Sequence, residues 1–478
     1  MLIAPLALLL ALADVASTAA PAPAPDTNTS TTVNTPAAAE AQPGAARSAT
    51  DAAHPPLTQG AMATAAQRQG GRKSSEDRLR FVWREHPSLR AGRWLRLDFG
   101  AKLQGDKMNP GDDPKNFDDL QLTRARLGVD GELFRVFQFS IEREMTSNGD
   151  VKLNAKSKKT NWRDVYGEIK VSDALQVRGG RFKIPFSLDQ LTGIANNDFI
   201  YRSLGATYLA PARDLGGMVH GRFFGRDITY AAGIFQHDGD NSRSNKVAGG
   251  DRTLAARVTA RLLKPIKFLN VDEAEFGGNL TTTDVSDVSE LPNGLRGRTV
   301  ISDFTFFDPV FVRGTRNRYG ADVDWSDHQL AARAEYIAVT DQRNGQGLRG
   351  DTLNSARAQA WYVQGTWLLT GERKDRPQRP SNPFPVEGPG AFELAARYER
   401  MWFDSKATGE PAFSNSRAEV ILPTGNKVFT AGLNWYLNRW VKLQFNAIHQ
   451  EVEDAGRTPL ADGGTKWWGT VFRAQLVL

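Results

Sequence analysis

Apolar and polar residues alternate along most of this chain, and the alternation is clearest from Trp94 onward. In the first clear segment, Leu95, Leu97 and Phe99 occupy every second position, and Arg96 lies between the first two. Successive side chains of a β-strand point to opposite faces of its sheet. The pattern therefore predicts strands that have one apolar face and one polar face.

Segments of this kind recur to the C-terminus and are separated by turn residues. Bacterial single-chain barrels have an even number of strands, and about 16 strands enclose an aqueous channel. The sequence thus predicts an all-β fold, a transmembrane antiparallel β-barrel of about 16 strands with long outer loops and short periplasmic turns. The predicted strands lie near residues 94–103, 120–130, 133–145, 162–171, 175–185, 216–225, 228–236, 253–262, 274–283, 318–325, 329–339, 359–370, 391–402, 427–437, 440–451 and 467–478.

The connections between these segments alternate in length. Asp130–Gly131 and Asn438–Arg439 mark tight turns, whereas the link 186–214 is long and polar. Two links on the short-turn side, near 263–273 and 371–390, are longer than the barrel pattern predicts. We interpret the basic cluster of the second link as a solvated turn; it consists of Arg373, Lys374, Arg376 and Arg379.

The strand at 175–185 requires a change of phase. Leu175 and Val177 share one phase of the alternation, whereas Phe182 and Ile184 share the other. A β-bulge at Gly179–Gly180 would reconcile the two phases, because one extra residue moves every later side chain to the opposite face. Such a bulge would direct one group of basic residues to the same side: Arg178, Arg181 and Lys183.

The N-terminal segment differs from the rest in composition. Residues 1–20 contain a continuous apolar stretch that is shorter than the ~20 residues a membrane-spanning helix needs, followed by small residues. This pattern predicts a secretory signal peptide. Residues 21–75 are rich in Ala, Pro, Thr and Ser and cannot bury enough apolar area to offset the entropy of ordering. We therefore expect a disordered periplasmic tail, followed by a barrel over residues 92–478.

Composition excludes several classes of chemistry. The chain has no cysteine, which excludes disulfide scaffolds, thiolate metal sites and cysteine nucleophiles. Its six histidines have no metal-ligand spacing, and no phosphate-binding loop or dinucleotide fingerprint is present. The sequence predicts no catalytic residues, no metal site, no cofactor and no nucleic-acid partner. A barrel enzyme stays open as an alternative, because His220 and His449 lie on predicted strands, although neither is part of a recognisable motif.

Alternation alone does not distinguish a lipid-facing surface from a protein core. A large soluble all-β protein is therefore the alternative architecture. The secretory start favours the membrane, as do aromatic residues near predicted strand ends, which suit the girdles at membrane interfaces. These aromatic residues are Trp94, Trp162, Trp361, Trp367, Trp435, Tyr436, Trp440, Trp467 and Trp468.

Five segments carry a family resemblance, and they follow one another in order from about residue 92 to the end. They are Arg124–Gly128 (RARLG), Gly180–Phe186 (GRFKIPF), Trp361–Glu372 (WYVQGTWLLTGE), Gly390–Tyr398 (GAFELAARY) and Gly432–Tyr436 (GLNWY). Together they resemble the phosphate-selective porin O and P family of bacterial outer-membrane porins. The resemblance implies a homotrimer of 16-stranded barrels, a constriction formed by an infolded third loop, and basic side chains along the path. The implied partners are inorganic phosphate or other small anions, with outer-membrane lipid and lipopolysaccharide around the barrel.

The resemblance also implies which side chains line the path. The paired arginines of the family's second strand correspond to Thr123 and Arg124, so one arginine is absent, and Arg126 follows in the inward phase. The third loop corresponds to 186–214, which lacks the lysines of the phosphate-specific members. The residues predicted for the anion path and constriction are Arg124, Arg126, Arg202, Arg213, Arg181, Lys183 and Arg96.

The function predicted from these observations is passive diffusion through a water-filled barrel in the bacterial outer membrane. The expected solutes are small anions such as phosphate, and the expected constriction is a loop whose Arg202 and Arg213 face Arg124 and Arg126. Inward acidic residues on the third and fourth strands predict moderate rather than strict anion preference. The alternatives are a general, weakly selective porin, a plugged barrel that does not conduct, and a barrel enzyme.

Overall fold

The computed structural model describes the barrel region of the chain. The predicted signal peptide (1–20) and tail (21–75) lie outside the described residues, as does most of the link 263–273. The described residues are 78–83, 86–111, 120–146, 161–241, 252–261, 273–286, 292–405, 416–460 and 462–478.

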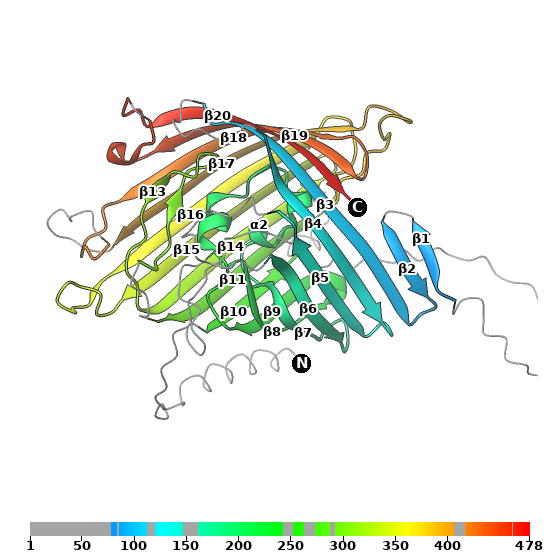
Figure 1. Cartoon of the computed structure of the whole chain (residues 1–478), viewed down its shortest axis with the longest axis horizontal. Coiled ribbons are helices and arrows are strands. Elements are labelled where there is room, and N and C mark those ends of the chain that lie inside the picture. Colours follow the sequence, from blue (N-terminus) through cyan, green and yellow to red (C-terminus); the bar gives the residue numbers. More distant parts are fainter. Residues whose placement is uncertain are drawn as a thin grey trace, which may run out of the picture. The chain divides into compact units, whose positions relative to one another are not determined.

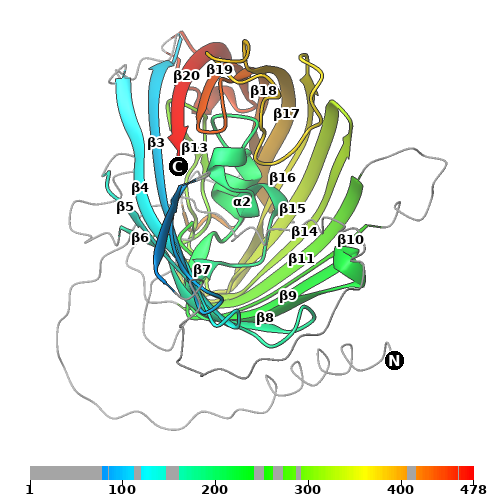
Figure 2. The ribbon, with the colours of Figure 1, turned by 90° about the vertical axis from the view of Figure 1, so that its right-hand side faces the viewer.

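Antiparallel strands form a closed barrel (Figure 1; Figure 2). The main sheet has 18 strands, of which β1 and β2 form a hairpin at its edge and the other sixteen close on themselves. Each barrel strand pairs with the next, and the last pairs with the first. The prediction of an all-β barrel of about 16 strands is confirmed. The barrel strands are β3 (Leu95–Asn109), β4 (Leu120–Leu133), β5 (Phe137–Glu144), β6 (Trp162–Lys170), β7 (Gln176–Lys183), β8 (Arg213–Phe223), β9 (Ile228–Phe235), β10 (Thr253–Ala260), β11 (Glu273–Val285), β14 (Gly314–Asp327), β15 (Leu330–Arg343), β16 (Leu353–Leu368), β17 (Ala391–Ser405), β18 (Thr424–Tyr436), β19 (Val441–Val452) and β20 (Lys466–Val477).

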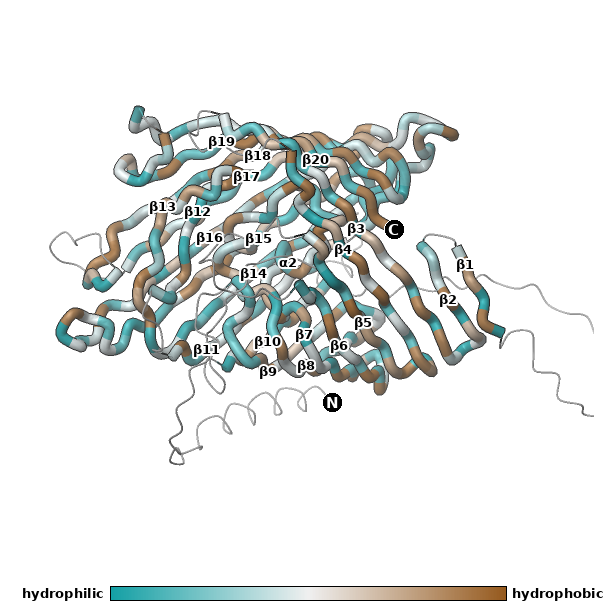
Figure 3. Tube along the Cα trace, viewed as in Figure 1, coloured by the Kyte–Doolittle hydropathy of each residue, from teal (hydrophilic) through white to brown (hydrophobic). Residues whose placement is uncertain are grey.

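Hydrophobic and hydrophilic residues alternate along the barrel strands (Figure 3), and in the barrel this alternation gives an apolar outer face and a polar inner face. On β17, Leu394 and Tyr398 are exposed on the outside, whereas Glu393, Arg397 and Glu399 are buried inside. Closure of the sheet pairs the backbone groups of every barrel strand on both sides, which a spanning structure needs because lipid offers them no partners.

The aromatic residues near the strand ends divide between the two faces. Trp367 and Trp468 lie on the outer face and are about half exposed, as an interfacial girdle requires. Trp467 and Tyr436 are buried on the inner face, so their predicted place in the girdle is wrong. The reason is their phase, because each occupies an inward position of its strand.

Short and long links alternate along the barrel and lie at opposite ends. We call the end that carries the tight links 134–136 and 171–175 the turn end, and the end that carries the long links 184–212 and 286–313 the loop end. The short links at the turn end include the 3-10 turn η4 (Phe224–Arg226). Another 3-10 turn, η6 (Ala455–Arg457), follows β19 at the loop end.

Strand β7 keeps one register along its whole length. Its pairing with β6 and with β8 runs through Gly179 and Gly180 without a shift, so the predicted bulge is wrong. Gly180 has a φ of 131°, a backbone conformation that glycine adopts readily and other residues rarely do. Because no extra residue changes the phase, Phe182 lies on the inner face and not on the lipid-facing side. It is buried there against Tyr166.

A hairpin precedes the barrel and was not predicted from the sequence. Strand β1 (Arg80–Trp83) pairs with β2 (Pro87–Ala91), and β2 pairs with the start of β3 from Ala91↔Leu95 to Ser88↔Asp98. Strand β20 covers the same edge of β3 only over Lys102–Asn109. Strand β2 thus covers an edge that would otherwise expose unpaired backbone groups.

Two long links fold into the barrel instead of extending from it. Link 184–212 carries the helical turns α2 (Leu188–Leu191), η2 (Ile194–Asn196) and η3 (Gly205–Leu209), and α2 lies within the barrel in Figure 2. Link 286–313 carries the hairpin β12 (Gly297–Arg298) and β13 (Thr305–Phe307). Within the described residues, no helix has the length and apolar character needed to cross a membrane. The buried apolar cluster that joins both links to the wall includes Leu204, Leu209, Phe306, Val339 and Phe403.

Candidate functional site

A cavity of about 890 Å³ occupies the barrel interior beside β3 to β10. Its lining reaches the turn end at Arg226 and the C-terminal Leu478. Toward the loop end it is bounded by Pro185 and Leu191, which belong to the inward link 184–212. The cavity therefore lies between the wall and the infolded third loop, where the sequence predicts a solute path.

Basic side chains outnumber acidic ones in the lining of this cavity. Ten Lys and Arg side chains contribute, against seven Asp and Glu side chains. In the ion pair of Arg96 with Asp98 (2.6 Å), the arginine is 34% exposed and the aspartate 15%. In the pair of Arg178 with Glu168 (2.6 Å), the values are 13% and 3%. In both pairs the cation is thus the more exposed partner, and both partners line the cavity.

Arg126 and Arg213 lie together at the loop-end side of this wall. The Nε of Arg126 donates to Glu144 at 2.6 Å, and Arg213 donates through two nitrogens to Asp164 at 3.2 Å. Glu142 is within electrostatic reach of both guanidinium groups. Both arginines are almost fully buried, and Arg126 alone of the two lines the cavity. The predicted proximity of a wall arginine and a loop-side arginine is present, and acidic side chains surround both.

Lys183 and Arg202 bind the backbone of the inward link. The ammonium of Lys183 donates to the carbonyl oxygens of Leu191 and Thr192 at 3.5 and 3.4 Å, and Lys183 lines the cavity. Arg202 donates to the Thr192 carbonyl and forms an ion pair with Asp189 at 3.6 Å. Arg202 is therefore directed to the loop itself, and the structure does not bring it into the group of Arg126 and Arg213.

The remaining predicted residues occupy separate places. Arg124 donates to Gln104 Oε1 at 2.8 Å on the neighbouring strand. Arg181 forms an ion pair with Asp240, beyond the end of β9. Arg96 lines the cavity near the turn end. Of the seven residues predicted for the path, the cavity is lined by Arg96, Arg126 and Lys183.

Acidic side chains of the opposite wall hold the inward link in place. Glu335 of β15 accepts from the Leu188 N–H at 2.9 Å, and Glu399 of β17 accepts from the Leu204 N–H at 2.6 Å. Both acids occupy inward positions of their strands. Their carboxylates satisfy buried backbone donors, which have no water to bind there. They contribute to the position of the loop.

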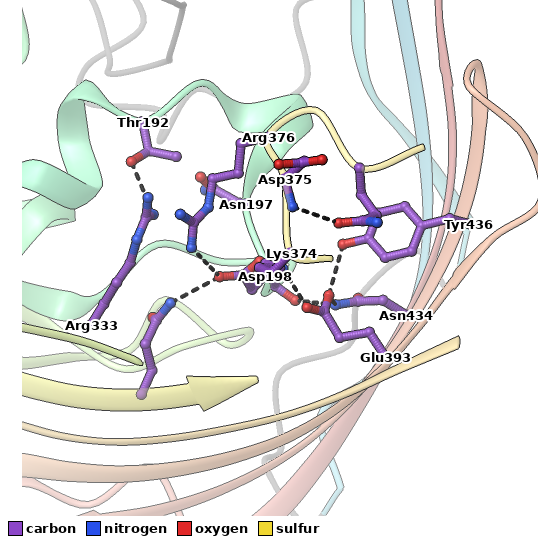
Figure 4. A network of polar contacts seen from close by, with 12 residues as sticks. Thr192, Asn197, Asp198, Arg333, Lys374, Asp375, Arg376, Glu393, Asn434 and Tyr436 are labelled. Atoms are coloured by element: carbon purple, nitrogen blue, oxygen red, sulfur yellow. Dashed lines mark hydrogen bonds and ion pairs between the residues drawn. The ribbon is translucent and has the colours of Figure 1, made fainter. Parts of the chain in front are cut away.

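The link 371–390 contacts the inward loop through a buried ion-pair network (Figure 4). The Lys374 ammonium bonds to Asp198 at 2.6 Å and also to Glu393. Tyr436 donates its hydroxyl proton to Glu393 at 2.7 Å, and Arg376 lies 3.6 Å from Asp198. Burial raises the pKa of Asp198, but Lys374 and Arg376 outweigh this effect and hold the pKa below its ordinary value.

The interpretation of this link as a solvated turn is wrong for Lys374. Its side chain is almost fully buried, whereas Arg373 and Arg379 are exposed as expected. The physical reason is that Asp198 and Glu393 need a cation in a place without water. The one signal in the sequence was the unusual length of the link for the turn end.

Asp238 is a second buried acid that fixes a link to the wall. It accepts from Arg316 at 2.6 Å and from Arg318 at 2.7 Å, both on β14. Burial raises the pKa of Asp238, but the two arginines outweigh this effect and lower it. Its loop sequence has a faint likeness to a calcium loop, yet across the described parts of the chain no group of His, Asp and Glu has the arrangement of a metal site.

Comparisons with known proteins agree with this architecture. The family model of phosphate-selective porin O and P matches residues 95–477. The outer-membrane protein OmpT of Vibrio cholerae superposes with a TM-score of 0.50 at 12% identity, over 82% of this chain and 100% of that one. A variant of it that lacks loop L8 superposes with a TM-score of 0.51 at 12% identity, over 80% and 99%. At this identity the likeness shows the fold. No curated protein sequence matches the chain.

Proposed function

The chain belongs to the phosphate-selective porin O and P family of outer-membrane channels for small solutes, and we propose that its channel passes small anions, inorganic phosphate among them, in preference to cations. Family and fold are those of a channel of the bacterial outer membrane rather than of an enzyme. The observation that carries the proposal is the excess of Lys and Arg over Asp and Glu in the cavity lining.

The expected selectivity follows from the position of these charges. An anion that enters a narrow passage loses hydration, and basic side chains replace part of it. Arg96 and Arg178 are more exposed than their acidic partners, so a passing ion has more access to the cation of each pair than to the acid. Because the acids remain close to these cations, the net field is weaker than that of a ring of unpaired arginines. We therefore propose a moderate preference for anions.

The residues predicted for the path divide into two roles in this proposal. Arg96, Arg126 and Lys183 line the cavity, where the partly exposed Arg96 contacts passing solutes and the buried Arg126 and Lys183 act on them through their charge. Arg202 holds the inward link through Asp189. The other three hold neighbouring strands and links through hydrogen bonds and ion pairs: Arg124, Arg181 and Arg213.

Removal of positive charge from the lumen tests the proposal. We expect the triple variant Arg96→Gln, Lys102→Gln and Arg222→Gln to lower the chloride-to-potassium permeability ratio severalfold, because all three line the cavity. The ratio is obtained from reversal potentials in a salt gradient. The acids left behind keep other neighbours or water, since Asp98 retains His86, Glu142 retains Arg126 and Asp173 is largely exposed.

A control variant removes the same charge from the outer face. Arg357, Arg400 and Lys427 lie at outward positions of β16, β17 and β18, and their replacement by Gln leaves the lumen unchanged. The proposal requires the permeability ratio to stay unchanged in this control. An equal fall in both triple variants would contradict a role of the lumen charges.

We further propose that the protein assembles as a homotrimer, which rests on its membership of the porin family. A homotrimer predicts a three-copy product after chemical crosslinking in mild detergent, and a mass in solution that agrees with three copies. A single-copy species under both measurements would contradict this assembly.

A further inference from the structure

An apolar patch interrupts the polar lining of the cavity on β6 to β9. The rings of Tyr166 and Phe182 meet edge to face with centroids 6.0 Å apart, and Phe182 meets Phe235 in the same way at 5.4 Å. Tyr166, Phe182 and the neighbouring Met218 all line the cavity. An aqueous path for inorganic ions has no need of such a surface, because aromatic rings offer them little in place of water.

Two glycines make room for these rings. Tyr166 pairs with Gly180, Gly180 with Gly216, and Gly216 with Phe235, so the four residues form one row across β6 to β9. A Cβ on Gly216 would lie 2.5 Å from the Phe235 ring, and a Cβ on Gly180 would lie 2.7 Å from the Tyr166 backbone. The Phe182 ring lies between the rings of Tyr166 and Phe235, and both phenylalanines are buried. Tyr166 alone of the three is partly exposed, and we call the exposed part of its ring, which lines the cavity, the seat.

Arg178 borders this seat, two residues before Gly180 on β7. Its guanidinium carbon lies 4.2 Å from the centroid of the Tyr166 ring and 5.5 Å from that of Phe182. Its Nε donates to Glu168 at 2.6 Å. Among the described residues, its two terminal nitrogens have no hydrogen-bond acceptor, and the side chain lines the cavity. The planar edge of the guanidinium group is therefore available to a solute.

This arrangement combines a donor pair with an adjoining apolar surface. The two terminal nitrogens of an arginine match the two oxygens of a carboxylate. The exposed part of the Tyr166 ring offers contact to an apolar group attached to that carboxylate. A phosphate ion presents oxygens on all sides and would turn some of them toward the rings. The chemistry of the seat thus fits an organic anion better than an inorganic one.

We propose that Arg178 and Tyr166, with Phe182 packed behind the Tyr166 ring, form a binding subsite for small organic monocarboxylates with an aromatic or branched apolar body. The subsite lies along the solute path, and it rests on the proposed preference for anions. The solute's carboxylate binds the edge of Arg178, and its apolar body lies over Gly180 and against the Tyr166 ring.

The test compares benzoate with acetate, two monocarboxylates that differ in the apolar body. Each is added to the unmodified protein in a planar bilayer while the chloride current is recorded. We expect benzoate to reduce the current at a concentration about three- to tenfold lower than acetate, the gain that one aromatic contact gives. Equal inhibition by the two anions would overturn the proposal, and this comparison requires no variant.

Variants assign the effect to the subsite. We expect Arg178→Gln to abolish the difference in inhibition between benzoate and acetate. We expect Tyr166→Ala to weaken inhibition by benzoate while leaving inhibition by acetate unchanged. The matched control is Arg222→Gln, which removes another lumen cation away from the rings. This control is expected to weaken inhibition by both anions and to leave the ratio of their inhibitory concentrations unchanged. A difference that survives both Arg178→Gln and Tyr166→Ala would place the binding elsewhere and overturn the assignment.

The same recordings separate this inference from the proposed function. Reversal potentials that show cation preference would contradict the proposed function. Anion preference together with equal inhibition by benzoate and acetate would contradict the subsite alone. Folding of each variant is checked by the shift in electrophoretic mobility on heating that stable barrels show.

Discussion

Replacement of Lys374 by methionine is expected to lower the free energy of unfolding by about 3–5 kcal/mol. The lysine bonds to Asp198 and Glu393, and all three side chains are almost fully buried. Its removal leaves Glu393 without its cation and Asp198 with only the more distant Arg376, in a place where water cannot replace the ammonium group. Denaturant unfolding of the protein in detergent micelles measures the change.

A neighbour in the same link provides the control. Arg373 is exposed, so Arg373→Met removes the same charge with little expected loss of stability. Because the network joins link 371–390 to the inward loop, we also expect the Lys374→Met channel to show larger fluctuations of current. Equal stability of the two variants would contradict a structural role for the network.

Replacement of Phe306 by alanine is expected to cost about 3–5 kcal/mol, the range found for buried aromatic side chains. Phe306 lies on β13, is fully buried, and meets Phe403 of the wall edge to face at 6.2 Å. The change opens a void in the apolar cluster that holds link 286–313 inside the barrel. We expect this link to detach more often and the single-channel conductance to rise.

The comparison variant for this change is Leu348→Ala. Leu348 lies on the loop-end link between β15 and β16 and is 82% exposed, so its truncation creates no void. We expect its unfolding and conductance to match those of the unmodified protein. If Phe306→Ala also matched it, the apolar cluster would not be what keeps the hairpin inside.

The alternation of side chains predicted the barrel strands because a lipid-facing sheet repeats every two residues. Segment 391–402 corresponds to β17 (Ala391–Ser405), and the segments before and after it correspond to strands in the same way. The period is a property of each strand alone, so it is readable without knowledge of its partners. The phase near Gly180 was misread because Phe182 is apolar but faces the lumen, and hydropathy does not distinguish that face from lipid.

Features that depend on distant partners were not predictable in this way. The inward path of link 371–390 depends on Asp198 and Glu393, and nothing in the local sequence of Lys374 reports them. The hairpin of β1 and β2 depends on the edge of β3 that β20 leaves uncovered. In both cases the determinant lies on another segment: the buried acids for Lys374, and the uncovered edge of β3 for the hairpin.

The sequence predicted the candidate site only in part, because the contacts in the site also depend on distant partners. Phase placed Arg126 and Arg178 on the inner face, and the structure has both in the cavity lining. Phase does not tell which acid stands beside each arginine, so the binding of Arg202 to Asp189 was not foreseen. The subsite around Arg178 also required the register of three strand pairs, which sets Tyr166 beside Gly180 and Gly216 beside Phe235.

The central claim of this account is that the lumen favours anions, and the reversal potential of the unmodified protein tests it most directly. The protein is incorporated in a planar bilayer that separates two concentrations of potassium chloride. The excess of lumen-facing Lys and Arg predicts a potential of the sign set by chloride, with a moderate permeability ratio that falls as salt screens the charges. A potential of the sign set by potassium would contradict the account.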